Sequence, residues 1–188
     1  MIILNNFDKK HNFDLCNLTI GVFDGLHLGH ALILQKLKEK KGKSIVFTFE
    51  NHPLEVLKPD IKIPLIYNKQ DKLKYLKSFG IDVVILIKFN IYFANIYYKD
   101  FFKILQKNFS FSHLVIGDDA KIGKDGEGDL NKIQDLEQEL HFKSEFIEKI
   151  KYKDRIISSR WIRALLKEKN YALAEKLLNR KLLKEKHV

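Results

Sequence analysis

Short apolar runs alternate with amphipathic segments along most of the chain, and this alternation restricts the fold more than any other feature. Residues 17–23 (NLTIGVF) and 43–49 (KSIVFTF) are apolar, β-branched runs typical of buried strands. The apolar-periodic segment between them starts at Ala31, carries lysines in its last turn and is followed by Gly42, which is typical of a helix. The first fifty residues therefore predict a βαβ unit with two parallel strands.

The same alternation continues through the rest of the chain. Further strands are expected over residues 83–87 and 114–116, with a last strand or extended segment over 146–152. Helices are expected over residues 68–79, 98–108, 131–140, 158–167 and 171–178, with Asn68 as the cap of the first of them. The pattern predicts an α/β fold in which a mostly parallel sheet is covered by helices on both faces.

Two groups of residues between or within these elements need separate interpretation. The charged, glycine-rich segment 118–129 (DDAKIGKDGEGD) is predicted to be a mobile surface loop. The aromatic residues Tyr92, Tyr97, Tyr98, Phe101 and Phe102 are expected to pack helices and core rather than to form a stacking platform for a ligand.

Length and residue types restrict the class of protein. The chain has 188 residues, 45% of them hydrophobic, which suits a single domain over residues 1–188. The one cysteine, Cys16, leaves no intrachain disulfide. Asp8, Lys9 and Lys10 interrupt the first thirteen residues, so these are not a signal peptide, and no apolar run is long enough to span a bilayer. We therefore expect a cytoplasmic protein.

The formal net charge of +10 has three possible interpretations. It can mark a nucleic-acid partner, a lysine-rich solvated surface, or a field that attracts small polyanions such as nucleotides. Because the lysines are spread along the whole chain rather than gathered in a patch, we favour the solvated surface over a nucleic-acid partner.

The stretch GVFDGLHLGH, residues 21–30, follows the first predicted strand and leads into a helix. The first turn of a helix presents unpaired N–H groups and partial positive charge, which suits a phosphate. Gly29 lets the backbone come close, and His27 and His30 can donate hydrogen bonds to an oxyanion. A zinc site would need further ligands, and a glycine turn with incidental histidines is the plain alternative.

Two other segments also follow predicted strands: FENHP, residues 49–53, and GDDAKIG, residues 117–123. In open parallel sheets ligands bind beyond the carboxyl ends of the strands. We therefore expect the three segments to meet at one edge of the sheet and to form one site.

These segments also carry a family resemblance. GVFDGLHLGH resembles the HxGH signature of the nucleotidylyltransferase superfamily, and in particular the FMN adenylyltransferase (FAD synthetase) module of bacterial bifunctional riboflavin kinase/FMN adenylyltransferases. Four further segments are similar to that family in the same order: FTFENHPLEVLKP (47–59), VIGDDAKIGKDGEGD (115–129), ISSRWIRALL (157–166) and AEKLLNR (174–180). The resemblance covers about residues 18–180 and implies a Rossmann-like nucleotidylyltransferase fold.

The resemblance implies that AMP passes from ATP to FMN, giving FAD and pyrophosphate, with Mg²⁺ escorting the triphosphate. An FMN phosphate oxygen would attack the α-phosphorus in line, and His27, His30 and Arg163 would stabilise the phosphates. The implied ATP-binding residues are Gly21, Phe23, Asp24, Gly25, Gly29, Ser158 and Ser159. The implied FMN-binding residues are His52, Pro53 and Asp119.

Several of these residues have more than one possible role. Ser158 and Ser159 head a helix as caps or as phosphate ligands, and Arg163 lies one turn after Ser159 on the same face. Asp24 could orient a histidine, bind through metal-bound water, or cap the turn.

The sequence also departs from the family pattern. Arg160 stands where the family has Ser or Thr, and Asn51 replaces a proline, which predicts a less rigid loop. Ala120, Lys121 and Ile122 replace Phe, Arg and Phe, so the pocket is expected to be lined differently. No riboflavin kinase motif is present, so we expect that domain to be absent from residues 1–188, which are either a naturally monofunctional protein or one half of a longer one. The alternatives are another adenylyl- or cytidylyltransferase with a different phosphorylated acceptor, and a non-catalytic, basic nucleotide- or nucleic-acid-binding module.

Overall fold

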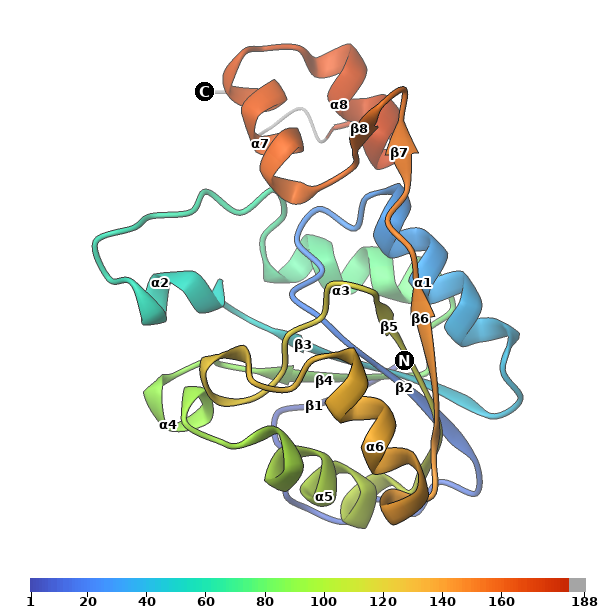
Figure 1. Ribbon diagram of the computed structural model, residues 1–188. Helices are drawn as coiled ribbons and strands as arrows, with labels where there is room; N and C mark the ends of the chain where they lie inside the picture. Colours follow the sequence, from blue (N-terminus) through green and yellow to red (C-terminus); the bar gives the residue numbers. More distant parts are fainter. Residues whose placement is uncertain (183–188) are drawn as a thin grey trace.

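The computed structural model describes residues 1–182, so the last six residues of the predicted 1–188 domain lie outside the described part. Its main sheet has six strands in the order β1-β4-β3-β2-β5-β6, and every neighbouring pair is parallel (Figure 1). The strands are β1 (Ile2–Leu4), β2 (Cys16–Ile20), β3 (Lys43–Phe49), β4 (Val83–Ile87), β5 (Phe111–Gly117) and β6 (Lys143–Ile147). This confirms the predicted α/β fold with a mostly parallel sheet.

Helices cover both faces of this sheet. Because successive side chains of a strand point to opposite faces, Ile45 and Phe47 of β3 belong to one core cluster while Val46 belongs to another. The cluster around Phe47 is closed by α5 (Tyr98–Phe109) and α6 (Leu130–Leu140). The cluster around Val46 is closed by α1 (Leu28–Glu39) and α3 (Lys69–Ser78).

A third apolar cluster joins the last two helices to the rest of the molecule. It contains Trp161 and Ile162 of α7 (Ser159–Lys167), Leu177 of α8 (Tyr171–Leu178), and Ile66 from the segment before α3. In Figure 1 these red helices lie together beyond α1, with the small antiparallel pair β7 (Lys151–Tyr152) and β8 (Arg155–Ile156) beside them. This packing brings the start of α7 to the edge where β2 ends.

The strand order decides where a ligand can bind. β2 pairs with β3 on one side and with β5 on the other, so the chain leaves β2 and β5 toward opposite parts of the sheet. Such a switch point opens a crevice beyond the carboxyl ends of its strands. The segments after β2, β3 and β5 are the three that the sequence singles out.

Several element boundaries differ from the sequence-based predictions. β2 ends at Ile20 rather than Phe23, and α1 begins at Leu28 rather than Ala31, because the intervening residues turn in left-handed conformations. β1 was not predicted; three residues with mostly exposed side chains carry no pattern, and pairing with β4 forms the strand. The expected segment 146–152 divides into the end of β6 and β7.

The segment predicted to be a mobile loop has a defined structure that includes a buried residue. Ile122 is 8% exposed and packs on the core around Phe47, and its backbone pairs with that of Gly128. A Cβ atom at Gly123 would lie 2.5 Å from the backbone nitrogen of Tyr98, so the glycine permits close packing on the start of α5. No helix within residues 1–182 is long and apolar enough to cross a membrane.

Candidate active site

The loop between β2 and α1 turns sharply through left-handed backbone conformations. Phe23, Gly25 and Leu26 have φ angles of 50°, 78° and 44°. Only glycine adopts this region without cost, and a Cβ atom at Gly25 would lie 2.7 Å from Cδ1 of Ile66. Phe23 and Leu26 are buried in the apolar cluster around Val46, and this burial offsets the cost of their backbone conformations.

His27 and His30 stack on one another at the start of α1. Their ring centroids are 3.8 Å apart with 15° between the planes, and His27 Nδ1 accepts a hydrogen bond from the His30 amide at 3.4 Å. A Cβ atom at Gly29 would lie 3.2 Å from Cε1 of His27, so this glycine leaves room for the imidazole. Because α1 begins at Leu28, both histidines lie at its positive N-terminal end.

Both imidazoles are neutral at pH 7. Burial lowers the pKa of His27 to about 4, helped by the charge of Arg180 and opposed by that of Asp119. Burial, His27, Lys72 and Arg180 hold the pKa of His30 well below its ordinary value. Each neutral ring carries one N–H donor, so the pair can donate hydrogen bonds without bringing charge of its own.

Asp24 and the start of α7 are joined by two contacts, and Asp24 makes a third with the segment before α3. The Asp24 carboxylate, 1% exposed, accepts from Arg163 Nη1 at 2.6 Å through one oxygen and from the Ile66 amide at 2.9 Å through the other. The Asp24 carbonyl accepts from Ser159 Oγ at 2.7 Å. Ser158 Oγ caps α7 by accepting from the Trp161 amide at 3.2 Å. Asp24 therefore orients an arginine, which none of the roles considered from the sequence included.

His52 has a similar local role after β3. Its Nδ1 accepts from the Leu54 amide at 3.2 Å and so caps α2 (Pro53–Leu57). Burial and Arg163 lower its pKa. Asn51 exchanges two hydrogen bonds with the backbone of Phe89, at 2.9 and 3.0 Å, so the loop predicted to be less rigid is tied to the segment after β4.

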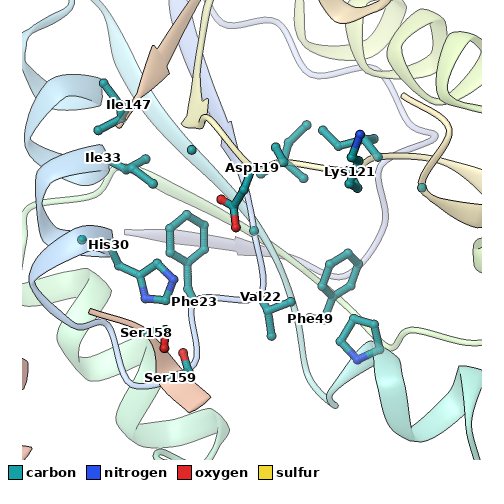
Figure 2. Close-up of a pocket in the computed structure, with 18 of the residues that line it drawn as sticks. Val22, Phe23, His30, Ile33, Phe49, Asp119, Lys121, Ile147, Ser158 and Ser159 are labelled. Carbon is teal, nitrogen blue, oxygen red and sulfur yellow. The ribbon is translucent and has the colours of Figure 1, made fainter. Parts of the chain in front are cut away.

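Asp119 lies in the turn after β5. Figure 2 shows its carboxylate pointing toward Phe23 and into the cavity. Its Oδ2 atom lies 2.9 Å from Lys149 Nζ, which follows β6. A Cβ atom at Gly117 would lie 3.1 Å from Asp119 Oδ1, so the glycine before the turn gives the carboxylate space.

A cavity of about 770 Å³ lies where these loops meet. One half, here called the polar half, carries His30, Ser158 and Ser159 beside Phe23 and Ile33 (Figure 2), and His27 stacks on His30 there. The other half is apolar and is formed by Phe49, Phe89, Phe93, Phe101 and Ile122. The segments after β2, β3 and β5, which were expected at one edge of the sheet, all contribute to this cavity.

The aromatic residues expected to pack in the core have mixed outcomes. Phe101 packs in the core, as predicted, but also lines the cavity, while Tyr92 is 83% exposed and thus not core.

The predicted site residues divide into two sets. Those that line the cavity are Gly21, Phe23, His27, Gly29, His30, Pro53, Asp119, Ser158 and Ser159. Asp24, Gly25, His52 and Arg163 lie behind it and contact the lining residues or their loops. Within residues 1–182 no group of three or more His, Cys, Asp or Glu side chains is placed to hold a metal ion.

A family model described as FAD synthetase matches residues 9–161. The chain belongs to the FAD synthetase family. It is 34% identical over 180 residues to a bifunctional riboflavin kinase/FMN adenylyltransferase of Buchnera aphidicola from Schizaphis graminum, covering 90% of this chain and 58% of that protein. It is 35% identical over 168 residues to the Escherichia coli K12 protein of the same description, covering 87% and 54%. The chain thus spans about half the length of these curated relatives.

Solved structures share the fold of this FAD synthetase family chain. A macrolide-efflux protein from Streptococcus pneumoniae superposes with a TM-score of 0.82 at 24% identity, over 96% of this chain and 60% of that one. A pantoate-beta-alanine ligase from Francisella tularensis superposes with a TM-score of 0.53 at 16% identity, over 95% and 85%. At these identities the likeness concerns the Rossmann-like α/β fold alone.

Two cations behind the site of this FAD synthetase family chain were missed from the sequence. Lys72 is 2% exposed and donates to the carbonyls of Val22 and Phe49 at 2.9 and 2.8 Å, which joins the segments at the ends of β2 and β3. Arg180 binds carbonyls of the loop before α1. Lys72 did carry a signal, because it lies four residues before Leu76 on the buried face of α3. Arg180 is the last residue of the family-like segment AEKLLNR (174–180), for which no role was predicted.

Proposed function

We propose that this chain is an FMN adenylyltransferase, which transfers AMP from ATP to FMN and releases FAD and pyrophosphate. The observation that carries the proposal is the division of one cavity into a half that suits phosphates and an aromatic half that suits a flat ring. Membership of the FAD synthetase family supports it.

The polar half suits the triphosphate of ATP. The N-terminal ends of α1 and α7 both lie there, and each presents unpaired amide groups and partial positive charge. His27 and His30 add neutral N–H donors, and Ser158 and Ser159 add hydroxyl groups. Arg163 does not line the cavity; its Nη1 donates to Asp24 and so holds the loop that leads to His27.

The apolar half suits the ring system of FMN. Phe49, Phe89 and Phe93 line it, and their rings contact one another at centroid distances of 5.3 to 5.4 Å. Pro53, held in place by the His52 cap, closes one side. Asp119 lies between the two halves, where the FMN phosphate would meet ATP.

In the proposed reaction an FMN phosphate oxygen attacks the α-phosphorus of ATP in line. The new P–O bond forms as the bond to the bridging oxygen of the β-phosphate breaks, and pyrophosphate leaves. The protein positions both phosphates and stabilises the charge on the equatorial oxygens through His27, His30 and the helix ends. We assign Mg²⁺ to the triphosphate as part of the substrate, because this ion keeps several of its waters and binds through substrate phosphates. The buried Cys16 thiol fits the reducing cytoplasm that we propose as its location.

The direct test is to incubate the chain with ATP, Mg²⁺ and FMN and to measure FAD and pyrophosphate together. We expect both products in equal amounts, and at least a hundredfold loss in His30→Ala because the donor at the helix start is gone. Lys74→Ala, on the exposed face of α3, is the control. Riboflavin in place of FMN should give no FMN.

Two outcomes would contradict the proposal. Product with another phosphorylated acceptor, and none with FMN, would assign a different nucleotidylyltransferase. Absence of product together with salt-sensitive binding of short DNA that survives His27→Ala and His30→Ala would assign a basic binding module.

A further inference from the structure

Side chains from three other elements and from the segment after α8 bind the carbonyl groups of the loop between β2 and α1. Val22 accepts from Lys72 and from Thr48 Oγ1, and Asp24 accepts from Ser159. Gly25 and Leu26 both accept from Arg180 Nη2, the second at 3.0 Å. This loop leads directly to His27, so its backbone direction sets where the imidazole lies.

Arg180 is itself held by two tyrosines. Its guanidinium lies 4.1 Å from the ring centroid of Tyr75 and 5.1 Å from that of Tyr67, and its Nε donates to the Tyr67 hydroxyl at 3.2 Å. It follows α8 and reaches carbonyls about 155 residues earlier in the chain. A planar group stacked on two aromatic rings loses little further freedom when it binds two carbonyls.

The direction of the carbonyl groups has a consequence for the amide groups. All peptide bonds described here are trans, so each C=O points opposite to the N–H of the next residue. Because the Gly25 and Leu26 carbonyls point to Arg180, the amides of Leu26 and His27 point away from it. Carbonyl oxygens that would repel a phosphate are thereby held against a cation.

Arg180 also acts on the histidine pair through its charge. The pair faces Lys72 from α3, Asp119 from the turn after β5, and Arg180 after α8. Burial has the largest effect on the pKa of each histidine, and the positive charge of Arg180 lowers both further.

We propose that Arg180 is a positioning residue for ATP: by binding the Gly25 and Leu26 carbonyls it holds the His27 imidazole at the start of α1 in the orientation that meets the triphosphate. This inference rests on the proposed function, since it assigns ATP to the polar half of the cavity. Arg180 does not line the cavity and acts through the loop.

The test compares Arg180→Met and Arg180→Lys with Lys181→Met, whose side chain is 91% exposed. Ala174→Gly, inside α8 and away from the loop, controls for lost stability. MgATP binding is measured by calorimetry without FMN, and the histidine resonances are titrated by NMR. Where FAD is formed, KM is measured for both substrates.

For Arg180→Met we expect MgATP binding to weaken about tenfold or more while KM for FMN changes little. The pKa of His27 should rise toward its ordinary value. Arg180→Lys keeps the charge but not the planar fork, so it should restore the low histidine pKa and only part of the affinity. Lys181→Met should match the wild-type chain, and Ala174→Gly should lower stability alone.

Unchanged MgATP affinity and His27 titration in folded Arg180→Met would overturn the inference. If Arg180→Met does not fold, Arg180→Lys provides the test, and an MgATP affinity equal to that of the wild-type chain in Arg180→Lys would overturn the inference. Failure of the chain to form FAD would count against the proposed function only, because binding and titration are read without FMN.

Discussion

The Asp24 carboxylate and the Arg163 guanidinium form a buried ion pair of 2.6 Å between residues 139 positions apart. Asp24 lies in the loop after β2 and Arg163 in α7, so the pair fastens the last two helices to the turn that carries the histidines. The Asp24 side chain is 2% exposed and that of Arg163 20%. Removing the charge of Asp24 leaves the arginine without its partner in a partly buried place.

Asp24→Asn should therefore lower the free energy of unfolding by about 3 kcal/mol, because one member of a buried pair remains uncompensated. FAD formation should fall as well, since the guanidinium loses its fixed direction. Urea unfolding and steady-state rates measure the two effects. Asp154→Asn, in the exposed turn between β7 and β8, is the control. Equal stability of the two variants would show that the ion pair contributes nothing.

Gly29→Ala should displace the His27 ring, because the new methyl group would lie 3.2 Å from Cε1. We expect slower FAD formation with little gain in stability. In a His27→Ala background the obstacle is absent, so the same substitution should stabilise α1 by up to about 1 kcal/mol through helix propensity. A double-mutant cycle of unfolding free energies measures this coupling, and additive effects would contradict the steric explanation.

Stability should decrease in acid because of His27. Its pKa is about 4 in the folded chain against an ordinary 6.5, so the unfolded chain binds more protons between these values. The unfolding free energy should fall by up to about 3 kcal/mol as the pH drops from 6.5 to 4. His27→Ala should lose the His27 share of this dependence and keep the share of His30, whose pKa is also lowered by burial, when both chains are measured by urea unfolding. His141→Asn, at the exposed end of α6, should retain it.

Lys72 should make the free energy of unfolding depend on pH in the alkaline range, again rising with pH. Burial lowers its pKa from 10.5 to about 8, so the unfolded chain binds more protons across that interval. The stability of the wild-type chain relative to Lys72→Met should therefore rise by up to about 3 kcal/mol between pH 8 and 10.5. Lys74→Met, exposed on the same helix, should show no such trend relative to wild type. If the difference in unfolding free energy between the wild-type chain and Lys72→Met did not change with pH, Lys72 would be an ordinary, solvated lysine.

Much of the fold and part of the site could be predicted from local patterns. Alternating apolar and amphipathic segments predicted the parallel sheet, and the caps Asn68 and Ser158 were placed correctly because capping depends on neighbouring residues alone. β1 and β6 were missed or displaced, since their pairing partners lie far away in the chain and their own side chains are mostly not buried.

The sequence by itself determined the alternation of strands and helices and placed His27, Gly29 and His30 after the first strand of the predicted βαβ unit. Only the tertiary structure decided that Lys72, Arg163 and Arg180 meet behind the same loop. Those contacts join residues 50 to 155 positions apart and depend on strand order and on the packing of α7 and α8. No local periodicity carries that information, because a lysine or arginine bound to a distant carbonyl has the same sequence neighbours as one in solvent.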